Sequence, residues 1–423
     1  MIDKAENIVY NVKKTILKES QMIESIILRN FKAFRNAEMK DIPPFCVIVG
    51  ANGSGKSTIF NVLGFLKDAM ASNVNVALSK LGGSRGLQEV RTRGAAYNES
   101  VEITLKFRNE KVVNDKNKQL LITYQLKLNE RNGRAYVEQE ILSYRRGSKG
   151  QPWRFLDFSD GKGKAVTNEA EKVSDVNQLD REEQSLKSND ILAIKGLAQF
   201  ERFPAVVALG ELIENWYVSD FHISKARPEQ EANFAEHLSR EGENLSLVVE
   251  YLYKHHPDKF AIILDKMKKR IPGINHVEAK TTEEGRVLLK FQDGAFEDPF
   301  LAKFVSDGTI KMLAYLVLLN DPKPYPLLCV EEPENQLYPK LLQELAEEFR
   351  EYANRGEQVM VSTHSPDFLN AARLDEVFWL EKKDGYTEIR RASDNEQIKA
   401  FMEDGDQMGY LWNQGFFGDV DPK

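Results

Sequence analysis

The segment from residue 50 to residue 57 constrains the fold of this chain more than any other. It reads Gly-Ala-Asn-Gly-Ser-Gly-Lys-Ser, a complete match to the pattern G-x-x-x-x-G-K-[ST]. The apolar run 45–49 before it indicates a buried strand, and residues 58–70 carry apolar side chains at helical spacing. A strand, a glycine-rich turn and a helix aim several backbone N–H groups at one point, where they can bind a phosphate. The sequence therefore predicts a site for a nucleoside triphosphate.

Two side chains of this loop carry specific chemistry. Lys56 has a charge that can reach the β and γ phosphates, and Ser57 offers a hydroxyl to Mg²⁺. The expected ATP-binding residues are Asn52, Gly53, Ser54, Gly55, Lys56, Ser57 and Thr58. We therefore expect ATP and Mg²⁺ as cofactors.

Composition narrows the class of protein. The formal net charge of −7 argues against a chain that coats nucleic acid by bulk charge, although a local basic patch stays open. Cys46 and Cys329 lie in apolar runs, which indicates buried thiols rather than a disulfide or a zinc site. No apolar run approaches the length of a membrane helix, and residues 1–20 lack the apolar core of a signal peptide. We expect a cytoplasmic protein without a membrane partner.

The first half of the chain has several patterns. Residues 1–21 carry apolar positions on one helix face and form either a docking helix or an extension before the first strand. Residues 101–146 alternate apolar and polar, which predicts antiparallel strands, and the polar segment 147–189 predicts hairpin tips or mobile loops. Residues 191–270 have mostly helical spacing, broken at 216–228, and sustain no long heptad repeat.

The second half contains further polar residues at the ends of apolar segments. Residues 274–291 predict two strands around a turn. Ser306, Asp307 and Gly308 come immediately before an apolar helix, where they can bind an anion or simply cap the helix.

An apolar run from residue 326 to residue 330 ends in two carboxylates, which is a Walker B pattern. Glu331 lies where Mg²⁺ needs a hard oxygen ligand. Glu332 is placed to orient and deprotonate an attacking water. His364 ends another apolar strand, and such a histidine is usually structural.

The order of these motifs resembles the ABC ATPase superfamily. Four short sequence segments resemble the corresponding motifs of its RecF/SMC-like branch, and specifically those of the compact ATPases of the OLD and Septu/Gabija type. They are LRNFKAF at 28–34, VSDGT at 305–309, EEPENQLYP at 331–339 and STHSP at 362–366. Glu331 stands where Asp is commoner, and Tyr338 where His is often found. The resemblance covers about residues 22–110 and 275–395.

The resemblance implies an α/β P-loop NTPase fold of the ABC type, with a mixed sheet, helices and a compact inserted α/β or helical subdomain. We expect an ATPase head formed by residues 22–110 and 275–395, an insertion at 111–274 and an acidic-aromatic tail at 396–423. Tyr410, Trp412, Phe416 and Phe417 in the tail either dock a partner or pack back onto the head.

The resemblance also implies residue roles. Ser306, Asp307 and Gly308 would serve the nucleotide of a second subunit, so that ATP joins a head-to-head dimer. Glu332 would be the general base and His364 the γ-phosphate sensor. Gln88 would touch Mg²⁺, although a lone glutamine can equally be a solvated loop residue.

The segment around residues 218–220, together with residues 241–245, further resembles small ATPases paired with a separate Toprim-like or HNH nuclease. This predicts a subunit of a bacterial anti-phage defence complex, with a nuclease or toxin partner and DNA or a phage product as the trigger. The chain lacks a nuclease acidic cluster after the ATPase motifs. The alternative is a RecF-like DNA repair ATPase. Basic residues for a DNA-facing loop, or for a merely solvated one, are Arg145, Arg146, Lys149, Arg154, Lys162 and Lys164.

Overall fold

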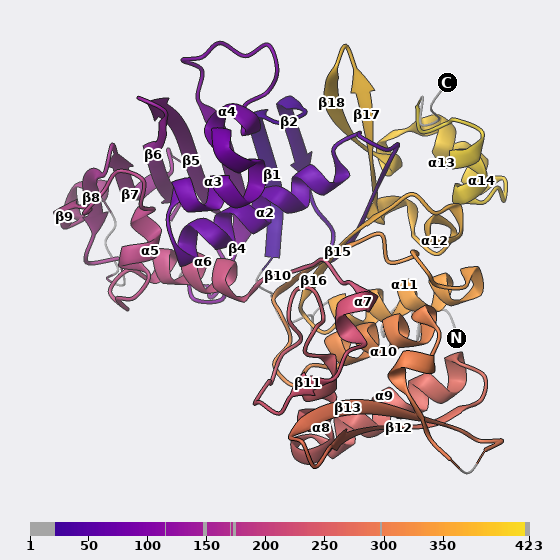
Figure 1. Cartoon of the computed structure of the whole chain (residues 1–423). Coiled ribbons are helices and arrows are strands. Elements are labelled where there is room, and N and C mark those ends of the chain that lie inside the picture. The colour runs from indigo at the N-terminus through magenta and orange to yellow at the C-terminus, as the bar shows by residue number, and fades with distance from the viewer. Residues whose placement is uncertain are drawn as a thin grey trace.

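The computed structural model describes residues 22–114, 116–146, 150–169, 171, 175–296 and 298–418. The helix or extension expected at residues 1–21 lies outside these ranges. The described chain forms two lobes that meet at a central sheet (Figure 1).

The central sheet is parallel except at its last strand. Its order is β10 (Tyr217–Ser219), β15 (Leu327–Glu331), β16 (Gln358–Thr363), β3 (Phe45–Gly50), β17 (Val377–Lys383) and β18 (Tyr386–Arg391). Successive residues of β3 enter different hydrophobic cores, since Val47 packs in one cluster and Ile48 in the other. A strand covered on both faces needs a continuous apolar run, which is why this strand could be predicted from its sequence.

The upper lobe in Figure 1 is built on an eight-stranded antiparallel sheet. Its strands in order are β2 (Phe34–Lys40), β1 (Met22–Phe31), β4 (Val101–Arg108), β5 (Ile122–Arg131), β6 (Arg134–Tyr144), β7 (Trp153–Ser159), β8 (Lys162–Val166) and β9 (Arg181–Ser185). The strands expected between 101 and 146 are confirmed. The loops expected at 147–189 are partly wrong, because β7 to β9 extend the sheet. Phe155 and Phe158, both buried, anchor β7 in the core despite the polar composition around them.

Helices α2 (Lys56–Ala71), α3 (Val74–Gly82), α4 (Leu87–Val90), α5 (Ala193–Leu197) and α6 (Pro204–Asn215) belong to the same lobe. Two buried glutamates hold the starts of α5 and α6. Glu140 accepts hydrogen bonds from the N–H groups of Ala193 and Ile194, at 2.5 and 3.0 Å. Glu169 accepts one from the N–H of Ala205 at 3.1 Å. Burial raises the pKa of both carboxyl groups to about 7, against the hydrogen bonds that lower it.

These raised pKa values predict a pH-dependent stability. Between pH 4.5 and about 7 the folded state retains protons that the unfolded state releases, so stability falls as the pH rises through this window. We expect the loss of stability between pH 5 and pH 8 to be about 2 kcal/mol smaller in Glu140→Gln than in the wild type. The measurement is the difference between the free energies of urea unfolding at the two pH values. The exposed Glu183→Gln is the control. An equal pH dependence in Glu140→Gln and the wild type would contradict the assignment.

The lower lobe contains a smaller sheet and several helices (Figure 1). The sheet comprises β11 (Gln230–Glu231), β13 (Arg286–Asp293), β12 (Ile274–Thr281) and β14 (Phe300–Leu301). The helices are α7 (Ile223–Ala226), α8 (Leu245–His255), α9 (Pro257–Arg270), α10 (Asp307–Leu319) and α11 (Pro339–Ala353). The two strands expected at 274–291 are confirmed as β12 and β13. They pair with each other and not with the central sheet.

The expected insertion at 111–274 does not coincide with a separate structural unit. Strand β5, inside it, pairs with β4 before it, for example Leu126 with Ile103. Strand β10 lies in the same segment and pairs in parallel with β15, Val218 opposite Cys329. Both large sheets therefore cross its expected boundaries.

The C-terminal segment forms α13 (Glu396–Glu403) and α14 (Met408–Asn413), and α14 packs back onto α12 (Pro366–Asn370) of the head. Trp412 and Phe417 are buried, and Phe417 packs against Trp379 with ring centroids 5.6 Å apart. Tyr410 stays 53% exposed. The N-cap of α13 is Asn395, whose side chain accepts from the N–H groups of residues 397 and 398.

Among the described residues, none of the helices combines the length and the apolar character needed to cross a membrane.

Candidate nucleotide site

The phosphate loop connects β3 to α2, as the sequence predicts. Gly55 is the N-cap of α2 with φ 106°, a left-handed conformation that favours glycine. Gly50 ends β3, where a Cβ would lie 2.4 Å from the Ser54 hydroxyl oxygen and 2.8 Å from the Leu380 carbonyl oxygen. A residue with a Cβ at Gly50 would therefore clash with these two oxygen atoms. The N-terminus of α2 faces the loop, where its free N–H groups can bind an anion.

The Lys56 side chain is buried against this loop. Its ammonium donates to the carbonyl oxygens of Gly50 at 2.6 Å and of Ala51 at 3.3 Å. Burial lowers the pKa of Lys56, while the nearby charges of Glu332, Glu334 and Glu331 raise it. A lysine held in this way is a preformed cation for phosphate oxygens.

The Walker B carboxylates lie beside the loop. Glu331 ends β15, and its carboxylate lines the same cavity as the Ser57 side chain. Burial raises the pKa of Glu331, the neighbouring Ser57 hydroxyl lowers it, and the charges of Asp220 and Glu332 raise it. Glu332 follows with φ 43°, a strained conformation for a residue other than glycine, and its N–H donates to the Ser362 carbonyl at 2.9 Å.

His364 and Glu332 approach each other at the ends of neighbouring strands. His364 Nδ1 lies 3.5 Å from Glu332 Oε1 and 3.3 Å from Glu334 Oε1. Glu334 is nearly buried and accepts hydrogen bonds from the Thr363 hydroxyl at 2.7 Å and the His364 N–H at 2.9 Å. Glu334 thus fixes the backbone at His364, a role for which the sequence analysis had named no residue.

The start of α10 is coupled to the loop after Glu332. Ser306 is the N-cap, and its hydroxyl accepts from the Thr309 N–H. A Cβ on Gly308 would lie 2.8 Å from the Gln336 carbonyl oxygen, so the helix start packs against this loop.

Lys311 strengthens that connection from the next turn of α10. Its ammonium donates to the carbonyl oxygens of Asn335 at 2.8 Å and Glu332 at 3.4 Å. Burial lowers the pKa of Lys311 to about 8, against the charges of Glu334 and Glu332. Asp307, on the first turn, pairs with Arg227.

A cavity of about 870 Å³ joins these elements. Its walls include Ser57, Glu331, Glu332 and Asp307, so it brings together four of the residues singled out from sequence. Gln88 is not among its lining residues, and its side-chain amide instead donates to Glu130 at 2.9 Å.

The cavity also contains side chains that sequence reasoning missed. Asp220 and His222 follow β10, whose carboxyl end lies beside that of β15 because the two strands are parallel. Their ligand atoms and that of Glu241 lie within 4.8 Å of one another. The signal in the sequence was an apolar strand ending in an acid, the same pattern that identified Glu331.

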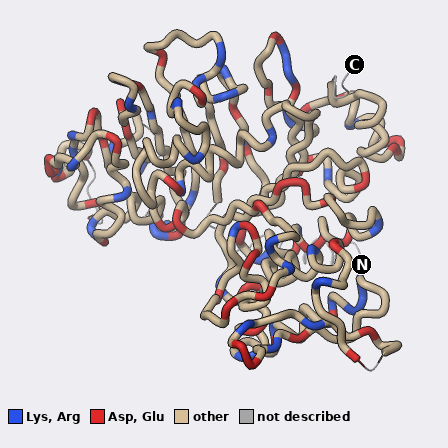
Figure 2. Tube along the Cα trace, in the orientation of Figure 1, with Lys and Arg blue, Asp and Glu red and all other residues tan. Residues whose placement is uncertain are grey.

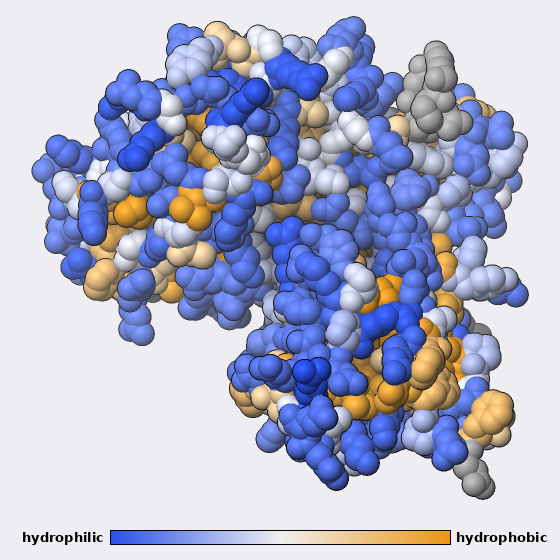
Figure 3. Space-filling view, viewed as in Figure 1, coloured by the Kyte–Doolittle hydropathy of each residue, from blue (hydrophilic) through white to orange (hydrophobic). Residues whose placement is uncertain are grey.

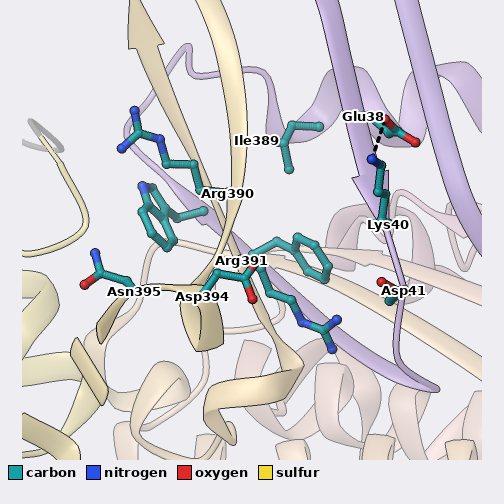
Figure 4. A pocket seen from close by; sticks show the side chains of 10 residues that line it. Glu38, Lys40, Asp41, Ile389, Arg390, Arg391, Asp394 and Asn395 are labelled. Carbon is teal, nitrogen blue, oxygen red and sulfur yellow. Dashed lines mark ion pairs between the residues drawn. The ribbon is translucent and has the colours of Figure 1, made fainter. Parts of the chain in front are cut away.

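A second cavity, of about 670 Å³, lies between β2 and the β17–β18 hairpin (Figure 4). Its basic residues are engaged within the chain. Lys40 pairs with Glu38 at 3.0 Å, and Arg390 pairs with Glu388 at 2.9 Å. The third basic side chain, Arg391, donates to the Asp375 carbonyl at 2.9 Å, so each of the three has a partner in the chain.

Solved structures share this fold. The chain is similar to a structure described as the SmcHead bound to the C-winged helix domain of ScpA, with a TM-score of 0.53 and 17% identity over 89% of this chain and 99% of that one. It is also similar to the Smc head domain with an extended coiled coil bound to the C-terminal domain of ScpA derived from Pyrococcus furiosus, with a TM-score of 0.51 and 14% identity over 91% of this chain and 100% of that one. At these identities the likeness shows the fold alone, which is the predicted P-loop fold of ABC type.

No match was found among curated proteins. A family model, however, matches residues 45–370, a range that contains the phosphate loop, the Walker B strand and His364. The chain therefore belongs to the family described as "AAA domain, putative AbiEii toxin, Type IV TA system".

Proposed function

We propose that this protein binds ATP with Mg²⁺ at residues 52–58 and hydrolyses it. The observation that carries the proposal is the cavity in which Ser57, Glu331 and Glu332 converge beside the preformed Lys56 loop. This is the set of groups that phosphoryl transfer to water needs: an anion cradle, hard oxygen ligands and a base.

The donor set fits Mg²⁺. The Ser57 hydroxyl and the Glu331 carboxylate line the same cavity, and Asp220 adds a third oxygen group to its wall. Oxygen donors of this kind suit a small, hard cation. When bound there, Mg²⁺ would neutralise charge on the β and γ phosphates.

Glu332 is the proposed general base. It would accept a proton from the attacking water at a carboxylate oxygen. The Asn335 amide donates to its Oε2 at 3.0 Å, and His364 stands 3.5 Å from its Oε1. Lys311 holds the Glu332 carbonyl, so the strained turn that orients the carboxylate is fixed from α10.

We further propose a head-to-head dimer in which Ser306, Asp307 and Gly308 of one subunit contact the nucleotide of the other. Two aromatic side chains near these residues support a partner surface, since Phe304 is 73% and Tyr338 66% exposed. Figure 3 shows hydrophobic residues gathered on the lower lobe, which carries α10. Exposed aromatic residues are enriched at protein interfaces.

Mixing two inactive variants tests the shared site. We expect Lys56→Ala and Ser306→Arg to be inactive alone, whereas an equal mixture recovers about a quarter of wild-type ATPase activity, because mixed dimers keep one intact site. If the mixture stays inactive and neither ATP nor Mg²⁺ produces a dimer by mass measurement, the two-subunit site is wrong.

For the biological role we propose a regulatory ATPase of a bacterial anti-phage defence complex, with a separate nuclease or toxin as effector. The family description, which names a toxin–antitoxin system, supports this role. Co-purification with the product of the neighbouring gene tests it. Recovery of the chain without any effector, and unaltered phage sensitivity on its deletion, would oppose it.

DNA repair is the less favoured alternative. Arg154 pairs with Asp157, and Lys164 with Glu183. Arg146 donates to the carbonyls of Glu169 and Glu171. Lys149 lies outside the described residues. Half of the six basic side chains considered for DNA thus already have partners in the chain, and both signs of charge are interspersed over both lobes (Figure 2).

A further inference from the structure

The β17–β18 hairpin packs on the phosphate loop, although more than 300 residues separate the two in sequence. The Thr387 hydroxyl donates to the Ser54 carbonyl at 2.6 Å, and the Thr387 N–H donates to the Ala33 carbonyl at 2.9 Å. The β17 backbone also approaches the loop, since the Leu380 carbonyl oxygen lies 2.8 Å from where a Cβ on Gly50 would be. The hairpin stands beside β2 in Figure 1.

Cross-strand pairing determines which hairpin side chains face the loop. Lys382 pairs with Thr387, and Lys383 pairs with Tyr386. Paired residues of antiparallel strands project from the same face, and successive residues of one strand from opposite faces. Lys382 therefore shares the face of Thr387, which contacts the loop, while Lys383 projects from the other face.

The ammonium of Lys382 reaches the loop itself. Its Nζ lies 4.0 Å from the position that a Cβ on Gly53 would occupy. Over the part of the chain that the structure describes, no carboxylate pairs with Lys382, whereas Arg390 on the same hairpin pairs with Glu381 at 3.5 Å and Glu388 at 2.9 Å. Lys382 is exposed, so its side chain can adjust to an anion held in the loop.

We propose that Lys382 is a second phosphate-binding cation for the nucleotide held at residues 52–58. This inference rests on the proposed nucleotide binding and adds to it a residue outside the loop motif. Lys56 acts from within the loop, and Lys382 adds charge-assisted hydrogen bonds from the hairpin above Gly53. Nucleotide binding and the position of the C-terminal hairpin are thereby linked.

The test compares Lys382→Met with Lys383→Met, its matched neighbour on the opposite face. We expect the Kd for a fluorescent ATP analogue with Mg²⁺ to rise about three- to tenfold in Lys382→Met at low ionic strength. The rise should shrink at high ionic strength, because salt screens an exposed charge. Lys382→Arg should restore the affinity, and Lys383→Met should bind like the wild type. Titrations with ADP and AMP would show which phosphate the lysine contacts.

The outcomes separate the two proposals. If the wild type binds no nucleotide, the proposed function fails. If the wild type binds and Lys382→Met binds equally well at low ionic strength, only the role of Lys382 fails. A loss that Lys382→Arg does not restore, or that is independent of salt, indicates a structural effect and also overturns the inference. Thermal unfolding of each variant checks that the fold is retained.

Discussion

Glu332→Gln should abolish ATP turnover and leave nucleotide binding intact. The amide keeps the shape and the contacts of the side chain, including an oxygen for Asn335, but it cannot take a proton from water. Loss of a general base lowers the rate by about 10²- to 10⁴-fold. With hydrolysis blocked, ATP should remain between two subunits, and the variant should appear as a dimer in ATP and Mg²⁺ by mass measurement.

The control is Glu351→Gln on α11, whose side chain is 71% exposed. It should hydrolyse ATP at the wild-type rate. Retained turnover in Glu332→Gln would assign the base elsewhere. If Glu332→Gln binds ATP without turnover but remains a monomer, Glu332 is still the proposed base and the head-to-head dimer is wrong.

Lys56→Ala should lose ATP affinity. The substitution removes a buried cation at the centre of the phosphate loop, and truncation of one partner of a buried charge pair costs about 2–5 kcal/mol. We therefore expect the Kd for ATP to rise by at least about thirtyfold, and the thermal stabilisation by ATP to disappear.

Lys80→Ala, at an exposed position on α3, is the control for loss of a lysine charge. Lys56 also holds two loop carbonyls, so the unfolding temperature without nucleotide should be compared. Unchanged affinity in Lys56→Ala would remove the phosphate loop from the proposed site.

The loop-strand-helix part of the site could be predicted because its chemistry is local. Gly55 needs a left-handed conformation, and β3 needs apolar residues on both faces; both requirements leave a pattern in neighbouring residues. The same holds for Glu331 at the end of a buried strand. Distance along the sequence alone did not place Gln88 in the cavity, because its side-chain amide donates a hydrogen bond to Glu130 instead.

The organisation into domains depended on pairing over long sequence distances. Composition at 147–189 indicates loops, yet β7 adds to the sheet because Phe155 and Phe158 reach the core. The hydrophobic pattern of β10 gives no information on which sheet it joins. Backbone hydrogen bonds between strands are alike for every sequence, so they do not distinguish one partner strand from another. The partner is selected by the packing of side chains in the whole chain.

The sequence by itself thus determined the P-loop class of this protein, and it placed Glu331, Glu332 and His364 at the ends of buried strands, since each lies in a short motif with its own backbone requirement. The tertiary structure alone decided that Asp220 joins those carboxylates, that Glu334 orients the backbone at His364, and that Lys382 reaches the phosphate loop. These three contacts arise from strands whose carboxyl ends meet at one edge of a parallel sheet and from a hairpin folded onto that edge, and no spacing along the chain encodes such proximity.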